Sequence, residues 1–183
     1  MKPNRKRPAL FLDRDGVIIV EKKFQIDIGA MEFYPGAVDA LKAVDRRFLK
    51  VIVSNQSGIA RNKFTQDDVE KFNRALSEKL KGEGIKINGW YFCPHGRRDN
   101  CLCRKPKSGM LLKAADELSV ELRESWMIGD KSSDILAGQA AGVKTVLVKT
   151  GYAGKERGAV PVKPHHVADN LYDAVQFING SWS

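Results

Sequence analysis

Two aspartates stand two residues apart near the start of the sequence, in the stretch FLDRDGVI. Asp13 and Asp15 follow an apolar run, and in an extended chain residues at this spacing share a face. Two carboxylates this close repel each other, and an oxygen-bound cation such as Mg²⁺ relieves the repulsion. An aspartate can also attack phosphorus while a second carboxyl group protonates the leaving group. An isolated pair is more often a solvated acidic turn, so this interpretation depends on the other motifs.

A cluster of hydrogen-bond donors follows a second apolar run, in VIVSNQSGIA. Ser54, Asn55, Gln56 and Ser57 precede Gly58, whose backbone is flexible. Hydroxyl, amide and backbone N–H groups in such a loop can surround phosphate oxygens. The alternative is an ordinary polar loop between a strand and a helix.

Two later stretches carry charge at comparable places, CRKPKSGML and WMIGDKSSDILAG. Lys105 could neutralise a transferring phosphoryl group, and Arg104 could bind a second anion with two parallel hydrogen bonds. Asp130 could complete a magnesium site, with Asp134 one helical turn later holding Lys131 or a metal-bound water. Taken singly, the two stretches also fit a solvated basic loop and an acidic helix N-terminus.

All three cysteines and one of the three histidines lie in FCPHGRRDNCLCRKP: Cys93, His95, Cys101 and Cys103. One residue separates Cys93 from His95, and one separates Cys101 from Cys103, so each of these two pairs can contact one ion. Three thiolates and one imidazole fill a tetrahedral Zn²⁺ site with no open position, which is typical of structural zinc. We expect this zinc loop, residues 93–103, to order the chain that leads into Arg104 and Lys105. Free thiols beside a surface histidine are the alternative.

Short apolar runs alternate with amphipathic segments along the chain, which predicts an α/β fold with a parallel sheet. The predicted strands are 9–12, 49–54, 87–93, 125–129, 144–149 and a short one at 167–170. The predicted helices are 36–47, 66–82, 108–118, 132–141 and 171–178, and residues 151–164 read as a loop. The reactive residues follow the predicted strands, and ligands bind at the carboxyl ends of strands in an open parallel sheet. No repeat or linker is apparent, so residues 1–183 are expected to form one domain.

Composition limits the classes of protein that are compatible with the sequence. The chain has 183 residues, of which 43% are hydrophobic and 29% charged, as in soluble globular proteins. The apolar runs are far shorter than a membrane span. Near the N-terminus only ALFL precedes returning charge, which is too short for a secretory signal, so we expect a cytoplasmic protein without membrane contact. The net charge of +9 is scattered and forms no basic stripe, which favours an anionic small molecule over nucleic acid.

The order and spacing of the motifs resemble the haloacid dehalogenase (HAD) superfamily of phosphohydrolases. FLDRDG, SNQSGIARNKF, CPH…CxCRKPxxGML and MIGDKxxD resemble the branch that contains the D-glycero-D-manno-heptose 1,7-bisphosphate phosphatases and the histidinol phosphatases. The resemblance runs from about Ala9 to Gly151. It implies a Rossmann-like parallel sheet flanked by helices. The short stretches after Gly16 and Gln56 leave little room for a cap domain, so we expect a capless enzyme.

The resemblance also implies catalytic roles for individual residues. Asp13 would attack phosphorus, and Asp15 would act as general acid and then as base for hydrolysis of the aspartyl phosphate. Ser54 would bind the phosphoryl group, Lys105 would stabilise it, and Arg104 would recognise the substrate.

Metal and substrate residues follow from the same resemblance. Magnesium would be held by Asp13, the backbone carbonyl of Asp15 and Asp130, with Asp134 in support. The expected substrate-binding residues lie in three segments: Glu21, Lys22, Lys23 and Phe24; Asn55, Gln56 and Ser57; and Arg104 with Lys131. The stretch EKKF at 21–24 departs from the pattern of the heptose enzymes.

The expected function is therefore Mg²⁺-dependent removal of the 7-phosphate of a heptose 1,7-bisphosphate through an aspartyl-phosphate intermediate. Histidinol-phosphate phosphatase is the alternative within this branch. A nucleic-acid-binding protein with a zinc loop is an alternative from another class, but its aspartate cluster would repel a polyanion. The short loops predict a monomer. The expected partner of the enzyme is a small sugar-phosphate substrate.

Overall fold

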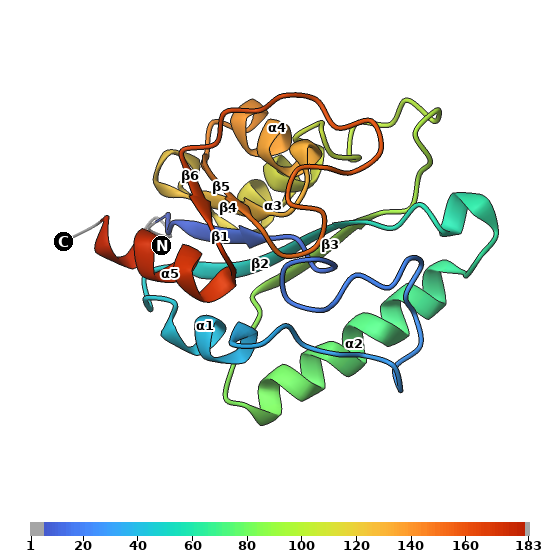
Figure 1. The fold of residues 1–183 in the computed structure, drawn as a ribbon, viewed down its shortest axis with the longest axis horizontal. Coiled ribbons are helices and arrows are strands. Elements are labelled where there is room, and N and C mark those ends of the chain that lie inside the picture. Colours follow the sequence, from blue (N-terminus) through green and yellow to red (C-terminus); the bar gives the residue numbers. More distant parts are fainter. Residues whose placement is uncertain (1–5, 182–183) are drawn as a thin grey trace, which may run out of the picture.

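A computed structural model describes residues 6–181 and contains one six-stranded sheet in which all neighbouring strands are parallel. The strands follow the order β3-β2-β1-β4-β5-β6 across the sheet (Figure 1). Their bounds are β1 Ala9–Leu12, β2 Leu49–Asn55, β3 Gly89–Cys93, β4 Trp126–Gly129, β5 Lys144–Val148 and β6 His166–Ala168. This arrangement confirms the predicted Rossmann-like α/β class. None of the helices in residues 6–181 is long and apolar enough to cross a membrane.

Helices cover both faces of the sheet, as Figure 1 shows. The helices are α1 Ala37–Ala43, α2 Gln66–Gly82, α3 Gly109–Leu118, α4 Ser132–Ala140 and α5 Leu171–Gly180, with short 3₁₀ turns at Ile59–Arg61 and Leu122–Glu124. Side chains alternate along β1, so Leu10 and Leu12 pack with α1, α2 and α5, whereas Ala9 and Phe11 pack with α3 and α4. All four residues of β1 are buried, as a strand at the centre of a sheet covered on both faces requires.

Local sequence signals explain several element boundaries. The side chain of Thr65 accepts the Asp68 amide, and Asp68 accepts the Thr65 amide, so the predicted start of α2 is a full capping box. The predicted helix 36–47 was too long, because α1 ends at Ala43. Val44 leaves the helical region at φ −57° and ψ 123°, and the carboxylate of Asp45 accepts the Arg47 amide at 2.9 Å to form a turn.

The strand predicted at 87–93 begins later, at Gly89. The backbone N–H of Asn88 donates to the Lys50 carbonyl at 2.7 Å, but the Lys50 amide is accepted by the Asn88 side chain at 2.9 Å, so this residue closes the connection into the sheet edge. The remaining elements agree with the prediction within one or two residues, including the short β6, which spans 166–168 where 167–170 was predicted.

Candidate active site

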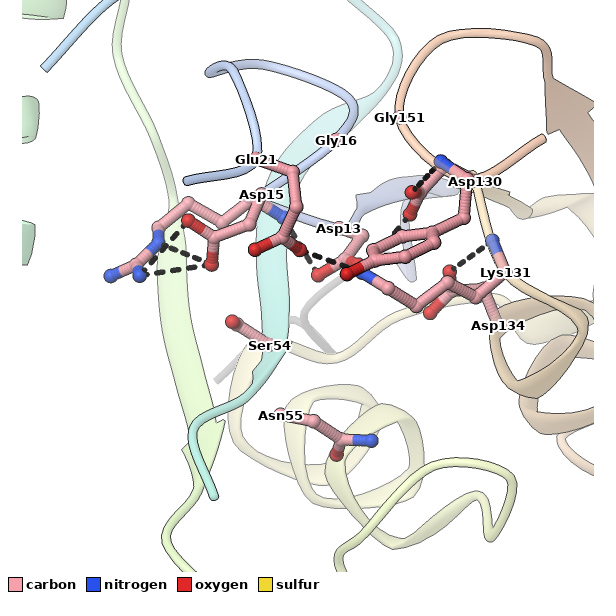
Figure 2. Close-up of polar contacts among 12 residues, drawn as sticks. Asp13, Asp15, Gly16, Glu21, Ser54, Asn55, Asp130, Lys131, Asp134 and Gly151 are labelled. Carbon is pink, nitrogen blue, oxygen red and sulfur yellow. Dashed lines mark hydrogen bonds and ion pairs between the residues drawn. The ribbon is translucent and has the colours of Figure 1, made fainter. Parts of the chain in front are cut away.

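The carboxyl ends of β1, β2 and β4 meet at one edge of the sheet and bring the predicted reactive residues together. Asp13 directly follows β1, Ser54 lies near the end of β2, and Asp130 directly follows β4. These residues surround the same space in Figure 2. Asp13, Asp15, Ser54, Lys105 and Lys131 line a cavity of about 1350 Å³, whose walls also include the zinc loop and the loop after β5.

Lys105 reaches into this edge from the segment before α3. Its ammonium group lies 3.1 Å from Asp13 Oδ1 and 2.6 Å from Asp134 Oδ1, and it donates to the Val53 carbonyl at 2.8 Å. Burial alone would raise the pKa of Asp13, but the ammonium groups of Lys105 and Lys131 outweigh it and the net shift is downward. Asp13 is therefore held as a carboxylate, the form that a nucleophile needs.

Asn55 fixes the backbone of Lys105. Its amide nitrogen donates to the Lys105 carbonyl at 3.0 Å and its amide oxygen accepts the Lys105 N–H at 3.1 Å. Asn55 was predicted to bind substrate, and it also lines the cavity. Both the nitrogen and the oxygen of the Asn55 amide bind the Lys105 backbone, so in the structure Asn55 positions Lys105.

Asp13, Asp130 and Asp134 form a buried carboxylate cluster, with one oxygen from each lying within 4.8 Å of the others. Burial raises the pKa of Asp130 to about 8, and the charges of Asp13 and Asp134 add to this effect, whereas Lys131 opposes it. Oδ2 of Asp130 accepts the Tyr152 amide at 2.8 Å, while its buried Oδ1 accepts no hydrogen bond within the described chain. A set of carboxylate oxygens with excess negative charge, including a buried oxygen without a hydrogen bond among the described residues, fits Mg²⁺.

Lys131 extends across this cluster. Its ammonium group lies 3.3 Å from Asp130 Oδ1, 3.6 Å from Asp13 Oδ2 and 3.3 Å from Glu21 Oε2. The ring of Tyr152 lies 5.0 Å from the same nitrogen. Burial raises the pKa of Glu21 despite the nearby ammonium group. Through its ion pair with Lys131, Glu21 joins the site from the loop after β1 and lines the cavity.

Asp134 contacts Lys131, one of the partners that the sequence indicated, and also Lys105, which the sequence did not indicate. The expectation was that Asp134 holds Lys131 or a metal-bound water. In the structure its Oδ1 pairs with Lys105 and its Oδ2 accepts the backbone amide of Lys131 at 3.0 Å. Asp134 thus positions Lys105 and closes the first turn of α4.

The carboxylate of Asp15 points to the opposite side from Asp130 (Figure 2). Its oxygens face the guanidinium group of Arg14, with Nη2 and Oδ2 2.9 Å apart. Gln56 Nε2 donates to Asp15 at 3.0 Å and to Ser54 Oγ at 2.6 Å, so it joins the proposed acid to the proposed phosphate ligand. Sequence reasoning missed Arg14, although it stands between the two aspartates of the motif.

The remaining predicted substrate residues divide into two groups. Those that line the cavity are Lys23, Phe24, Gln56, Ser57 and Arg104. Lys22 is not among the lining residues, because its ammonium group contacts the Ala30 carbonyl at 2.8 Å and Glu32 at 2.9 Å. The ring of Phe24 meets that of Phe64 edge to face, with centroids 6.4 Å apart, and forms an apolar part of the wall.

The four predicted zinc ligands converge in one cluster, of which Cys101 lines the cavity. Sγ of Cys93 lies 3.5 Å from His95 Nδ1, 3.7 Å from Cys101 Sγ and 3.2 Å from Cys103 Sγ. One ligand atom from each of the four residues lies within 4.8 Å of the others, a spacing that a tetrahedral ion can bridge. The side chain of Arg104 donates to the His95 carbonyl at 3.0 Å, which ties the zinc loop to the predicted substrate arginine.

A further wall comes from the segment after β5, which the sequence indicated only as a loop. The Tyr152 amide binds Asp130, and the Thr150 hydroxyl donates to the Gly16 carbonyl at 2.7 Å. Arg97 of the zinc loop donates to the Arg157 carbonyl at 2.9 Å, so the two loops meet over the cavity. These contacts use backbone atoms, for which the sequence carries no signal.

The parallel sheet presents two aspartates after its first strand, a serine on the second and an aspartate after the fourth, and a lysine precedes a helix. This combination defines a HAD-like hydrolase. In agreement, a family model described as HAD-hydrolase-like matches residues 102–174.

Relatives with assigned functions match most of the chain. The D-glycero-beta-D-manno-heptose-1,7-bisphosphate 7-phosphatase of Pasteurella multocida (strain Pm70) is 38% identical over 182 residues, which are 95% of this chain and 98% of the relative. The enzyme of the same name from Escherichia coli (strain K12) is 42% identical over 153 residues, covering 79% of this chain and 80% of the relative.

Solved structures agree with this result. The D,D-heptose 1,7-bisphosphate phosphatase from B. bronchiseptica, complexed with magnesium and phosphate, superposes with a TM-score of 0.85 at 27% identity and covers 95% of this chain and 99% of that one. The chain belongs to the heptose-bisphosphate phosphatase family of HAD-like hydrolases, and it is a phosphoric monoester hydrolase.

Proposed function

We propose that this enzyme removes the 7-phosphate of D-glycero-D-manno-heptose 1,7-bisphosphate in a Mg²⁺-dependent reaction. The observation that carries the proposal is the identity of 38–42% to enzymes of that activity over most of the chain. The cavity of about 1350 Å³ accommodates a small sugar phosphate, and cationic side chains lie both at its base and along its outer wall.

The proposed reaction begins with Asp13. Its carboxylate attacks phosphorus and forms an aspartyl phosphate, while Asp15 donates a proton to the departing sugar oxygen. Lys105 and the Ser54 hydroxyl take up negative charge on the phosphoryl oxygens. Asp15 then accepts a proton from the water that hydrolyses the intermediate.

Magnesium would be held by Asp13, Asp130 and the backbone carbonyl of Asp15. When bound, the ion screens the repulsion between the attacking carboxylate and the phosphate. Support for this assignment comes from the buried Oδ1 of Asp130, which has an ion-pair contact with Lys131 but no hydrogen bond among the described residues, and from the raised pKa of the Asp130 carboxyl group. A ligand set made only of oxygens favours Mg²⁺ over softer metals.

We propose that the cysteine and histidine cluster binds a structural Zn²⁺. Three sulfur atoms and one imidazole leave no open position for substrate. The ion would order the zinc loop and, through the bond from Arg104 to the His95 carbonyl, fix the arginine that would bind the substrate phosphate that is not cleaved. The loop would therefore contribute to substrate recognition and not to the chemical step.

We also propose that residues 1–183 act as one domain and as a monomer in the cytoplasm, without a nucleic-acid partner. The single sheet that runs through the described residues supports the first part. Light scattering on the purified enzyme gives the oligomeric state directly.

The decisive experiment measures Mg²⁺-dependent phosphate release from a panel of esters. The panel contains the α and β anomers of the heptose 1,7-bisphosphate, histidinol phosphate and glucose 6-phosphate, and ³¹P NMR identifies which phosphate remains. We expect preference for a heptose bisphosphate with the 1-phosphate retained. A preference for histidinol phosphate would replace the proposed substrate and leave the mechanism intact, whereas retention of the 7-phosphate would refute the proposed regiochemistry.

A further inference from the structure

We propose that Arg14 is a positioning residue for Asp15. It fixes the carboxylate of the general acid by linking it to helix α2 and to the loop after β1. The inference rests on the role proposed above for Asp15 and gives a role to Arg14, a residue of the first motif to which the sequence analysis assigned none.

Arg14 is buried as few arginines are, with a relative exposure of 1%. Its Nε donates to Asp15 Oδ2 at 3.1 Å and its Nη2 donates to Asp15 Oδ1 at 3.2 Å. Both carboxylate oxygens are therefore bound by two nitrogens of one planar group. A bidentate pair of this kind fixes the orientation of a carboxylate as well as its position.

The other side of the guanidinium group is anchored to two further segments. Nη1 donates to Asn73 Oδ1 on α2 at 2.8 Å, and Nη2 reaches the Gln25 carbonyl in the loop after β1 at 3.4 Å. The group also lies over the ring of Phe72, 4.5 Å from its centroid. Arg14 is thus held by residues far from it in sequence, and it transmits their placement to Asp15.

A purely structural role explains these contacts less well. Burying an arginine carries a large desolvation cost, and an apolar side chain of similar volume packs as well or better. What the guanidinium group adds is geometric control of the neighbouring carboxylate. Asp15 lines the cavity, and Gln56 is the other side chain that binds its carboxylate among the described hydrogen bonds. Loss of Arg14 would let the acid rotate about its side-chain bonds.

The position of an acid matters when the leaving group needs its proton. A sugar alkoxide is a poor leaving group and depends on protonation, whereas 4-nitrophenolate leaves without a proton. The value of kcat/KM reports only the steps up to formation of the aspartyl phosphate, so the later role of Asp15 as a base does not enter it. The ratio of kcat/KM for a sugar phosphate to that for 4-nitrophenyl phosphate therefore measures how well the acid is placed.

The experiment compares this ratio in the wild type, Arg14→Lys and Asn73→Ala, with Asp15→Asn as the limiting case. Lysine keeps the charge but cannot bind both carboxylate oxygens and Asn73 together. We expect the ratio to fall about 10- to 100-fold in Arg14→Lys, since misplacement of a catalytic group by about 1 Å costs about 10²-fold. Asn73→Ala leaves the arginine in place with one anchor removed, so a smaller fall of about 3- to 10-fold is expected.

Two further variants separate positioning from folding. Asn73→Asp keeps an acceptor oxygen for Arg14 and should restore most of the ratio. Asn179→Ala is the matched control, because Asn179 is also half-buried and makes two hydrogen bonds, to Ala43 and Asp45 at the C-terminal end of α1. We expect its ratio to equal that of the wild type.

The possible results are distinct. Equal losses on both substrates in Arg14→Lys and Asn73→Ala, or no loss on either, would overturn the inference and leave the proposed function standing. An unchanged ratio in Asp15→Asn would refute the acid role of Asp15, and the inference with it. If the wild type prefers another alkyl phosphate to the heptose bisphosphate, the proposed substrate fails, and the ratio is measured with that ester.

Discussion

Replacing Lys105 by methionine should lower the free energy of unfolding by roughly 3–5 kcal/mol, which is the usual loss when one partner of a buried ion pair is removed. The ammonium group lies 2.6 Å from Asp134 and 3.1 Å from Asp13, and all three side chains are buried. With an effective dielectric constant of about 20, these contacts contribute about 6 and about 5 kcal/mol of attraction, against a desolvation cost of several kcal/mol. Methionine fills the space but removes the ion-pair partner at 2.6 Å from Asp134 and leaves Asp13 with the more distant ammonium group of Lys131, 3.6 Å away.

The pH dependence of this loss has a definite sign. Without the ammonium group, burial raises the pKa values of the orphaned carboxyl groups above those of the unfolded chain, as it already does for Asp134. The penalty is then present above the raised pKa and disappears as pH falls and the groups bind protons. The difference in stability between wild type and Lys105→Met should therefore be larger at pH 8 than at pH 5.

Urea unfolding followed by tryptophan fluorescence, to which the buried Trp126 contributes, measures both effects. In thermal unfolding we expect a fall in Tm of roughly 10 °C, from about 2–4 °C per kcal/mol for a chain of this size. Lys113→Met is the matched control: its ammonium group lies 3.8 Å from Glu117 on the exposed face of α3, and such pairs contribute about 0.5 kcal/mol or less.

A double variant isolates the pairwise energy. Asp134→Asn removes the charge and keeps an oxygen for the Lys131 amide. The double variant with Lys105→Met should lose roughly 1–3 kcal/mol less than the sum of the single variants, because the carboxylate that the missing lysine would leave unpaired is also gone. A loss below about 1 kcal/mol for Lys105→Met at pH 8, or full additivity, would refute this account of the buried pair.

Three further outcomes are expected. Asp13→Asn should fold normally and lose more than about 10³-fold in Mg²⁺-dependent phosphate release, because the nucleophile is gone; near-normal turnover would exclude the covalent route. Cys101→Ser should lose zinc, measured as metal per chain, together with stability and activity; a zinc-free protein with full activity and Tm would contradict the role of the loop. Ser125→Ala should cost about 1–3 kcal/mol in urea unfolding and leave kcat unchanged, because its buried hydroxyl joins the Ala9 amide to the Glu121 carbonyl; a kcat that falls with stability would contradict the assignment of a structural role.

The sequence predicted the edge of the sheet where the site lies because the signals there are local. An apolar run followed at once by Asp13, Ser54 or Asp130 identifies both a strand and its carboxyl end. The capping box at Thr65 and Asp68 likewise lies within one turn of helix. Pattern reasoning succeeds where a few adjacent residues decide the structure.

The features that it missed depend on contacts between distant segments. The burial of Arg14 requires Asn73 and Phe72 of α2, and an arginine in a charged motif otherwise reads as exposed. Tyr152 reaches Asp130 through a backbone amide, which any residue other than proline could supply. Lys22 and Lys23 are adjacent and chemically alike, yet only Lys23 lines the cavity, because the path of the loop directs each side chain.

The central place of β1 has a consequence for how the protein is made. β1 is the first strand to leave the ribosome, and its neighbours are β2 and β4, with Leu10 paired to Trp126 and Phe11 to Met127. A nascent chain can form the pair of β1 with β2 early, but the other edge of an entirely apolar strand stays open until β4 has been synthesised. The carboxylate cluster that contains Asp13 is likewise incomplete until Asp130 has been synthesised. Chains released before that point would present a bare strand edge, a surface prone to aggregation, so we expect fragments that end before β4 to require chaperones and to lack phosphatase activity.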